Sequence, residues 1–145
     1  MSPDRAPFSS LSFPVGPLGI IAMDSCKEIA QKVDAWLLEE RHGETGNKEG
    51  LSSFFINSRC PRFSNGEAKA IIDESVRGKD IYILCDVGNY SLTYNFMGNT
   101  NHMSPDDHFA DLKRIISAIA GKAKRINVIM PFLYGGRQHK RVVRE

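Results

Sequence analysis

Short apolar runs separated by helical patterns constrain the fold of this chain more than any other feature. The clearest run is Ile81–Cys85, which lacks the alternation of apolar and polar residues that a half-exposed strand shows. Similar runs occur at Leu18–Met23 and Ile126–Met130. Strands of this kind are buried on both faces, as in parallel sheets covered by helices. The sequence therefore predicts an α/β domain with a mostly parallel sheet.

Two segments between these runs have helical periodicity. The first follows Asp24 or Ser25, either of which can cap a helix, and is predicted to end at Gly43. The second starts after Ser104, with a proline at the first helical position and two acids in the first turn. Gly121 is predicted to end this second helix.

The remaining segments are less regular. Two further strands are predicted at Phe54–Ile56 and Ala68–Ile72, and Arg59–Glu67 is expected to be irregular because it carries turn signals. Asn89–Asn101 combines apolar residues with a Gly-Asn-Thr-Asn loop signal, and no element is assigned to it. The resulting order, β-α-β-β-β-α-β, is typical of an α/β domain.

Length and composition exclude several classes of protein. A chain of 145 residues usually forms one domain, and a net charge of +2 is too small to indicate a nucleic-acid or membrane partner. Met1–Pro17 lacks the pattern of a signal peptide and is interpreted as a disordered extension. The cysteines show no CxxC spacing and are expected to be buried, reduced thiols of a cytoplasmic protein: Cys26, Cys60 and Cys85.

Residues 131–141 are the first candidate for a binding site, because they follow a predicted strand and ligands bind beyond the carboxyl ends of such strands. Gly135 and Gly136 would let the backbone approach a ligand closely. Arg137 offers a planar set of donors that suits phosphate oxygens. The residues alone leave open a solvated basic loop, which would include Gln138, His139 and Lys140.

The turn Arg62–Glu67 is the second candidate. Phe63 can stack on a purine, while Asn65 and Glu67 can form hydrogen bonds with its edge. The alternative is an ordinary turn with the phenylalanine in the core. Two pairs of neighbouring acids are interpreted as structural: Asp73-Glu74 and Asp106-Asp107. No catalytic set and no metal-ligand spacing is found in the sequence.

Taken together, three segments resemble ribose-phosphate pyrophosphokinase (phosphoribosyl pyrophosphate synthetase): Arg62–Glu67, Asp73–Asp80 and Lys124–Gln138. The resemblance extends from about Leu18 to Glu145 and concerns the N-terminal half of that family. It implies a phosphoribosyltransferase-like (Rossmann-like) three-layer fold with a mostly parallel sheet. It also implies assembly into homo-oligomers.

The resemblance further implies a reaction. Ribose 5-phosphate and ATP would give phosphoribosyl pyrophosphate and AMP with Mg²⁺, for nucleotide biosynthesis, as the anomeric hydroxyl attacks the β-phosphorus. Phe63, Asn65 and Glu67 would contact adenine, reaching the ATP of a neighbouring subunit. Arg137 and Gln138 would lie along the ATP phosphates. Further contacts with phosphate or nucleotide are possible at two positions: His139 and Lys140.

The chain departs from the family pattern in two ways. His139 stands where an acid is common, which resembles a divergent branch that also has the insert at Asn101–His108. The family's metal-binding histidine, catalytic loop and ribose-phosphate loop are expected downstream of Glu145. No catalytic or metal-binding residue is therefore predicted here, and the chain alone is expected to be inactive. The alternative is a non-catalytic regulatory or scaffolding homologue that assembles with full-length subunits.

Overall fold

A parallel three-stranded sheet forms the centre of the computed structural model, which describes residues 14–45, 52–138 and 140. The strand order is β1-β4-β7. The strands are β1 (Leu18–Ala22), β4 (Asp80–Leu84) and β7 (Arg125–Ile129). The predicted α/β class with a parallel sheet is confirmed. Most of the extension predicted at residues 1–17 lies outside the described residues.

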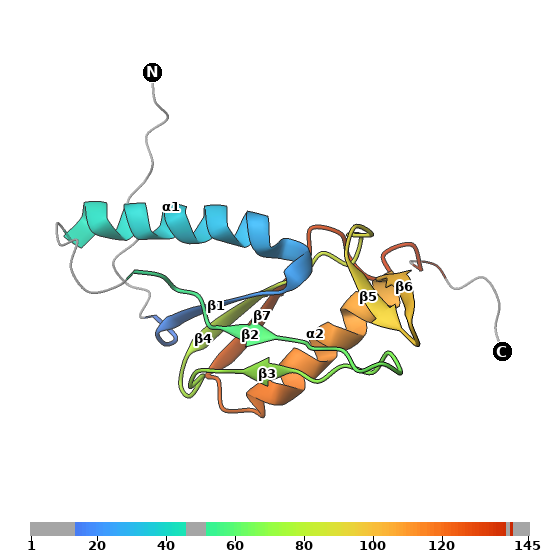
Figure 1. The fold of residues 1–145 in the computed structure, drawn as a ribbon. Helices are drawn as coiled ribbons and strands as arrows, with labels where there is room; N and C mark the ends of the chain where they lie inside the picture. Colours follow the sequence, from blue (N-terminus) through green and yellow to red (C-terminus); the bar gives the residue numbers. More distant parts are fainter. Residues whose placement is uncertain (1–13, 46–51, 139, 141–145) are drawn as a thin grey trace, which may run out of the picture.

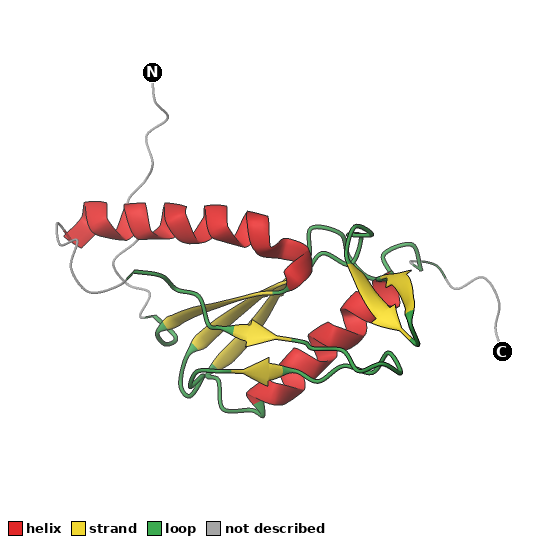
Figure 2. Ribbon diagram, in the orientation of Figure 1, coloured by secondary structure: helices red, strands yellow, loops and turns green. Residues whose placement is uncertain are grey.

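Two helices cover opposite faces of this sheet, which gives three layers (Figures 1 and 2). They are α1 (Lys27–Thr45), which follows the short 3₁₀ helix η1 (Asp24–Cys26), and α2 (Pro105–Ile119). Each face has its own core, because side chains of a strand alternate between faces. The core on the α2 face includes Ile21, Ile81, Ile83, Leu112, Ile115 and Ile119. The core on the α1 face includes Ile20, Leu84, Cys26, Ala30 and Phe54.

Both ends of α2 lie where the sequence predicts them, whereas the carboxyl end of α1 does not. A capping box fixes the start of α2, in which the Asp107 amide donates to the Ser104 hydroxyl at 3.2 Å and the Ser104 amide donates to the Asp107 carboxylate at 2.9 Å. Gly121, with φ +66°, follows its last turn, as predicted. The prediction that α1 ends at Gly43 was wrong, because the helix continues to Thr45. One glycine in an exposed helix costs only about 1 kcal/mol relative to alanine.

The predicted strand Phe54–Ile56 lies beside β1 but pairs with it through a single bridge. Ile20 donates to this segment and accepts from it, at 2.8 Å in both bonds. Gly19 makes the close approach possible, because a Cβ there would lie 2.4 Å from Cδ1 of Ile56. The sheet therefore extends beyond β1 only as a short extended segment.

Two small antiparallel ribbons differ from the prediction. β2 (Ser58–Arg59) pairs with β3 (Ile71–Ile72), so the strand predicted at Ala68–Ile72 is shorter, and Arg59 lies in a strand rather than in an irregular segment. β5 (Thr93–Phe96) and β6 (Asn99–His102) form a hairpin that the sequence did not reveal. Met97 and Gly98 connect them, both with positive φ, as two-residue hairpin turns require.

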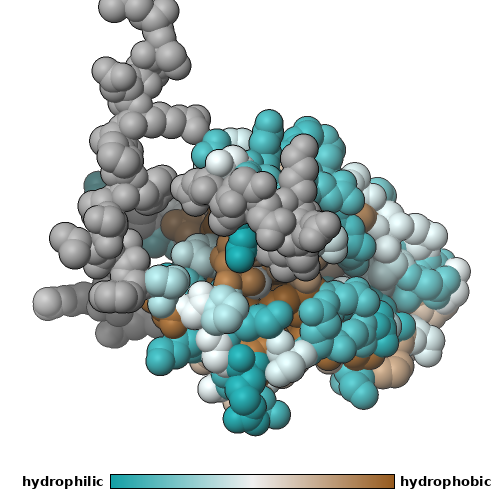
Figure 3. All heavy atoms as spheres, turned by 90° about the vertical axis from the view of Figure 1, so that its left-hand side faces the viewer, coloured by the Kyte–Doolittle hydropathy of each residue, from teal (hydrophilic) through white to brown (hydrophobic). Residues whose placement is uncertain are grey.

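Part of the apolar surface of α1 and β7 remains exposed. Ile29, Val33 and Trp36 recur on one side of α1 and are 46, 36 and 48% exposed. Val128 and Ile129 of β7 are 41 and 46% exposed. Because strands of parallel sheets are normally covered on both faces, the exposed apolar side chains of α1 and β7 are suited to packing against another element or chain. Hydrophobic atoms are also visible between hydrophilic ones at the end of the molecule that holds the amino ends of the strands (Figure 3).

Asp80 at the start of β4 should stabilise the fold in a pH-dependent way. Its carboxylate accepts bonds from Nε of Arg125 at 2.8 Å and Nδ2 of Asn127 at 3.0 Å. The bond from Arg125 lowers the pKa of Asp80 below its ordinary value of 3.8. We expect Asp80→Asn to lower the free energy of unfolding by ~1–2 kcal/mol at pH 7 in urea titrations.

This stabilisation should be complete above the ordinary aspartate pKa of 3.8 and disappear as the pH falls through the lower pKa of the folded state. The unfolding curves of wild type and variant should therefore converge in acid. A difference that stays constant across this range would contradict the role assigned to the Asp80 carboxylate.

The exposed apolar side of α1 should promote self-association. Sedimentation velocity across a concentration series is expected to show dimers or larger species, and Trp36→Lys should shift the distribution toward monomer because it places a charge in the apolar surface. Gln31→Lys is the matched control, since it adds the same charge at an exposed position of the same helix that lies about 140° around the helix axis from Trp36. Wild-type chain that stays monomeric throughout would contradict this expectation.

Candidate functional site

The carboxyl ends of β1, β4 and β7 meet at one end of the sheet, on the right in Figure 1. Polar contacts join the segments that follow them. The Asp86 amide donates to the Ser25 hydroxyl at 3.1 Å, and the Asn89 side chain donates to the Ser25 carbonyl at 3.2 Å. Nε2 of the buried His108 donates to the Asn89 carbonyl at 2.8 Å. Ligands of parallel α/β sheets bind at this end, and both predicted binding segments lie there.

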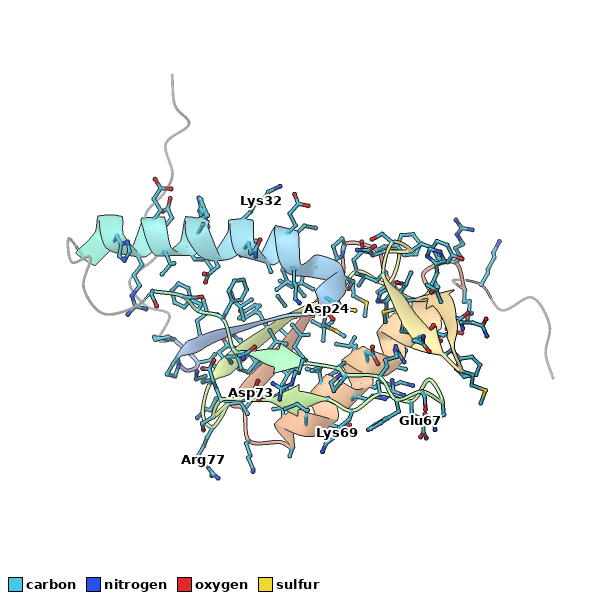
Figure 4. The ribbon with its side chains drawn as sticks, in the orientation of Figure 1. Asp24, Lys32, Glu67, Lys69, Asp73 and Arg77 are labelled. Carbon is cyan, nitrogen blue, oxygen red and sulfur yellow. The ribbon has the colours of Figure 1, made fainter. Side chains whose placement is uncertain are left out.

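The turn Arg62–Glu67 is present, and its own hydrogen bonds hold it. The Phe63 amide donates to the Glu67 carbonyl at 2.7 Å, and the Gly66 amide donates to the Phe63 carbonyl at 2.9 Å. Nδ2 of Asn65 donates to the Glu67 carboxylate at 2.7 Å. The Phe63 side chain is 55% exposed, so the alternative that placed it in the core was wrong. Glu67 also lies at the surface of this end of the molecule (Figure 4).

Arg62 lies beneath the turn and joins it to α2. Its side chain is only 10% exposed. One terminal nitrogen donates to the Gly66 carbonyl at 2.9 Å, and the other donates to the Asp111 carboxylate, also at 2.9 Å. The guanidinium lies 4.5 Å from the centre of the Tyr94 ring, in the range of a cation–π contact. Arg114 also donates to Asp111, at 2.7 Å.

Sequence reasoning assigned no role to Arg62 or Asp111. The available signal was the position of Asp111 in the stripe of buried residues along α2, next to Leu112 and four residues before Ile115. Burial raises the pKa of this carboxyl group, against the opposing effect of the Arg62 and Arg114 charges. A carboxylate in such a stripe needs a charged partner, because burial of an unpaired charge is costly. The partner itself is evident only in the folded chain.

The β5–β6 hairpin packs against the other side of the turn. The Met97 amide donates to the Ser64 carbonyl at 2.9 Å. A Cβ at Gly66 would lie 3.0 Å from the Phe96 ring, so the hairpin approaches the turn as closely as a glycine allows. Gly66 also has φ +85°, a conformation that other residues rarely adopt. The turn is therefore held from α2 and from the hairpin.

The pocket that Arg62 lines is too small for a nucleotide. Its volume is about 100 Å³, whereas sites for small-molecule ligands usually enclose about 300–1,000 Å³. Its lining includes Arg62, Tyr94 and Asp111, but none of the five residues predicted to contact ATP. Cys60 also lines it and is partly buried, less than expected. Burial, with the nearby Asp111, raises the pKa of this thiol to about 11, so it is no nucleophile at neutral pH.

The loop after β7 is anchored to the start of α2. The Tyr134 hydroxyl donates to Asp106 at 2.7 Å, and its ring stacks on Phe109 with centres 4.0 Å apart. Beyond this anchor the chain turns at Gly135, which has φ +70°. The predicted polar contacts beyond it are exposed: Arg137, Gln138 and Lys140. His139 lies outside the described residues.

The structure brings the turn and the loop to one end of the sheet without joining them in one pocket. In the view of Figure 1 the β5–β6 hairpin stands between them. Phe63, Asn65 and Glu67 form one exposed group, and Arg137 and Gln138 form another. A ligand that touched both groups would lie on an open surface unless a second chain completed the site.

Asp73 and Glu74, which are predicted to be structural, both form contacts with the segment before the turn. Asp73 forms an ion pair with Arg59, and Glu74 accepts from the Asn57 amide at 3.0 Å. Among residues 14–45, 52–138 and 140, no three His, Cys, Asp or Glu side chains gather so as to hold a metal ion. Within the same described ranges, no helix is both long and apolar enough to cross a membrane.

Comparison with known proteins identifies the family. The family model described as the N-terminal domain of ribose phosphate pyrophosphokinase matches residues 18–145. Ribose-phosphate pyrophosphokinase 1 of Schizosaccharomyces pombe is 36% identical over 95 residues, which are 65% of this chain and 19% of that protein. The chain thus spans about a fifth of the length of this curated relative. It belongs to the ribose-phosphate pyrophosphokinase family, of which residues 18–145 represent the N-terminal, phosphoribosyltransferase-like domain.

Proposed function

We propose that this chain is the ATP-contacting N-terminal part of a ribose-phosphate diphosphokinase. The intact enzyme would transfer diphosphate from ATP to ribose 5-phosphate, giving phosphoribosyl pyrophosphate and AMP for nucleotide biosynthesis. The observation that carries this proposal is an exposed Phe63 on a turn that hydrogen bonds fix, within a chain of this family. An aromatic ring held in this way suits stacking on a purine base.

The polar groups beside Phe63 suit adenine. The Glu67 carboxylate can accept a hydrogen bond from the 6-amino group, and the Asn65 amide can donate to a ring nitrogen. Their mutual bond of 2.7 Å keeps the two side chains together before a base arrives. Guanine would place a carbonyl oxygen where adenine has its amino group, so the carboxylate would disfavour it. The turn therefore favours ATP over GTP.

The loop after β7 would bind the phosphates of ATP. Arg137 and Gln138 are exposed beyond the Tyr134 anchor, and an arginine fork suits phosphate oxygens. Lys140 is exposed as well, and we include it with His139 as further candidate contacts. Stabilising the charge on the transferred diphosphoryl group is the main task of a protein in such reactions.

Mg²⁺, ribose 5-phosphate and a second copy of the chain belong to the proposal for the intact enzyme. The described residues offer no cluster of metal ligands, so Mg²⁺ would be held elsewhere in the longer protein. The separation of the base turn from the phosphate loop suits a site shared between subunits of a homo-oligomer. We place this enzyme in the cytoplasm, where its nucleotide substrate is found.

A regulatory or scaffolding subunit is the second candidate function. It is favoured by the exposed apolar side of α1 and by Val128 and Ile129 of β7, which a longer homologue could cover. Such a subunit would bind full-length synthetase and change its activity without turnover of its own. Co-sedimentation with full-length synthetase distinguishes it, and absence of a complex would exclude it.

Removal of the Phe63 ring should weaken ATP binding. Stacking of a base on an aromatic side chain contributes about 1–3 kcal/mol, so Phe63→Ala should raise the Kd for ATP roughly 5- to 150-fold in calorimetric titrations. Tyr90→Ala is the matched control, because Tyr90 is comparably exposed, at 63% against 55%, but belongs to another segment, where its ring stacks on His102. Equal affinities of the two variants for ATP would contradict the proposal.

The chain alone should not complete the reaction. Because it matches only the N-terminal domain of the family and the described residues hold no metal-ligand cluster, we expect no AMP release that depends on ribose 5-phosphate. A coupled assay for AMP with and without the sugar phosphate tests this. Turnover above the sugar-free control would show that this chain contains a complete site.

A further inference from the structure

We propose that Arg62 is a positioning residue for the base-binding turn, holding the Gly66 carbonyl and the Asp111 carboxylate at once. The inference rests on the proposed function, because it gives Arg62 a purpose only if Phe63, Asn65 and Glu67 meet a base. The observation that supports the inference is independent of the one that supports the proposed function. The buried guanidinium of Arg62 donates hydrogen bonds to the backbone of an exposed turn and to a buried acid on α2.

The geometry requires the planar fork of an arginine. The two terminal nitrogens of Arg62 point to different partners, the Gly66 carbonyl and the Asp111 carboxylate, each at 2.9 Å. The Tyr94 ring lies against the guanidinium face, with its centre 4.5 Å away. A lysine carries the same charge but has one compact ammonium group, which cannot reproduce a planar fork stacked on a ring.

Arg62 is unsuited to touch the nucleotide itself. Its side chain is nine-tenths buried, and its donors face the turn backbone and α2 rather than solvent. The pocket that it lines has a volume of only about 100 Å³. Its influence must therefore pass through the turn.

The contribution of Arg62 to the order of the turn depends on the other contacts that hold the turn. Bonds within the turn fix its shape, and the hairpin bond from the Met97 amide to the Ser64 carbonyl fixes one side. The bond from Arg62 connects a second point of the turn, the Gly66 carbonyl, to the rigid α2 helix through the ion pair with Asp111. The exposed Phe63 ring is thus presented on a backbone that is already ordered, which lowers the entropy cost of binding a base.

Arg62→Lys and Arg114→Lys form a matched pair of variants. Both keep the charge beside Asp111, but only Arg62 bonds to the turn. We expect Arg62→Lys to weaken ATP binding about tenfold while changing the affinity for inorganic tripolyphosphate, which lacks a base, less than about twofold. Arg114→Lys should leave both affinities unchanged. Equal losses for ATP and tripolyphosphate in Arg62→Lys would overturn the proposal, because a purely structural defect would weaken both.

Amide hydrogen exchange of the nucleotide-free chain separates this inference from the proposed function. The Gly66 amide should exchange faster in Arg62→Lys than in Arg114→Lys, with core amides such as those of β4 unchanged in both. If the wild-type chain binds no ATP, the proposed function is wrong. The exchange rate of the Gly66 amide still tests whether Arg62 holds the turn. Equal exchange at Gly66 in the two variants would overturn the positioning role.

Discussion

The hydrogen bonding of β4 on both of its edges is the constraint on which the rest of the structure depends. The chain leaves the neighbouring strands β1 and β4 in opposite directions. From β1 it runs through α1 to residues 54–56 on the outer side of β1, and from β4 it runs through α2 to β7. The carboxyl ends of β1 and β4 therefore lie where the strand order reverses, the usual place for ligands in such sheets. Ser25 and Asn89 connect these two ends directly.

The sequence predicted the parts of the fold that local signals determine. Short, mainly apolar runs revealed β1, β4 and β7, and the cap at Ser104 revealed the start of α2. The hairpin at Thr93–His102 was missed because its second strand reads Asn-Thr-Asn-His, and a two-residue turn at Met97-Gly98 determines its register. The motif at Arg62–Glu67 gave the turn, but the Arg62–Asp111 ion pair joins residues 49 positions apart and arises only from tertiary packing.

The candidate site is an exposed surface divided by the hairpin rather than a pocket within one chain. A preset turn and an anchored loop explain how short exposed segments can still present side chains in a defined way, because both are held by buried or stacked groups behind them. This arrangement differs from a deep cleft, in which the walls themselves enclose the ligand. Under the proposed function, a neighbouring chain or domain would complete the site.

The α2 helix contacts both candidate segments, the turn and the loop after β7. Asp106 in its first turn anchors the loop through Tyr134, and Asp111 holds the turn through Arg62. These acids are five residues apart on one rigid helix, a rise of about 7.5 Å. A single helical segment therefore fixes the distance between the two anchors. An insertion in the first two turns of α2 would alter this spacing even if every side chain at the surface stayed the same.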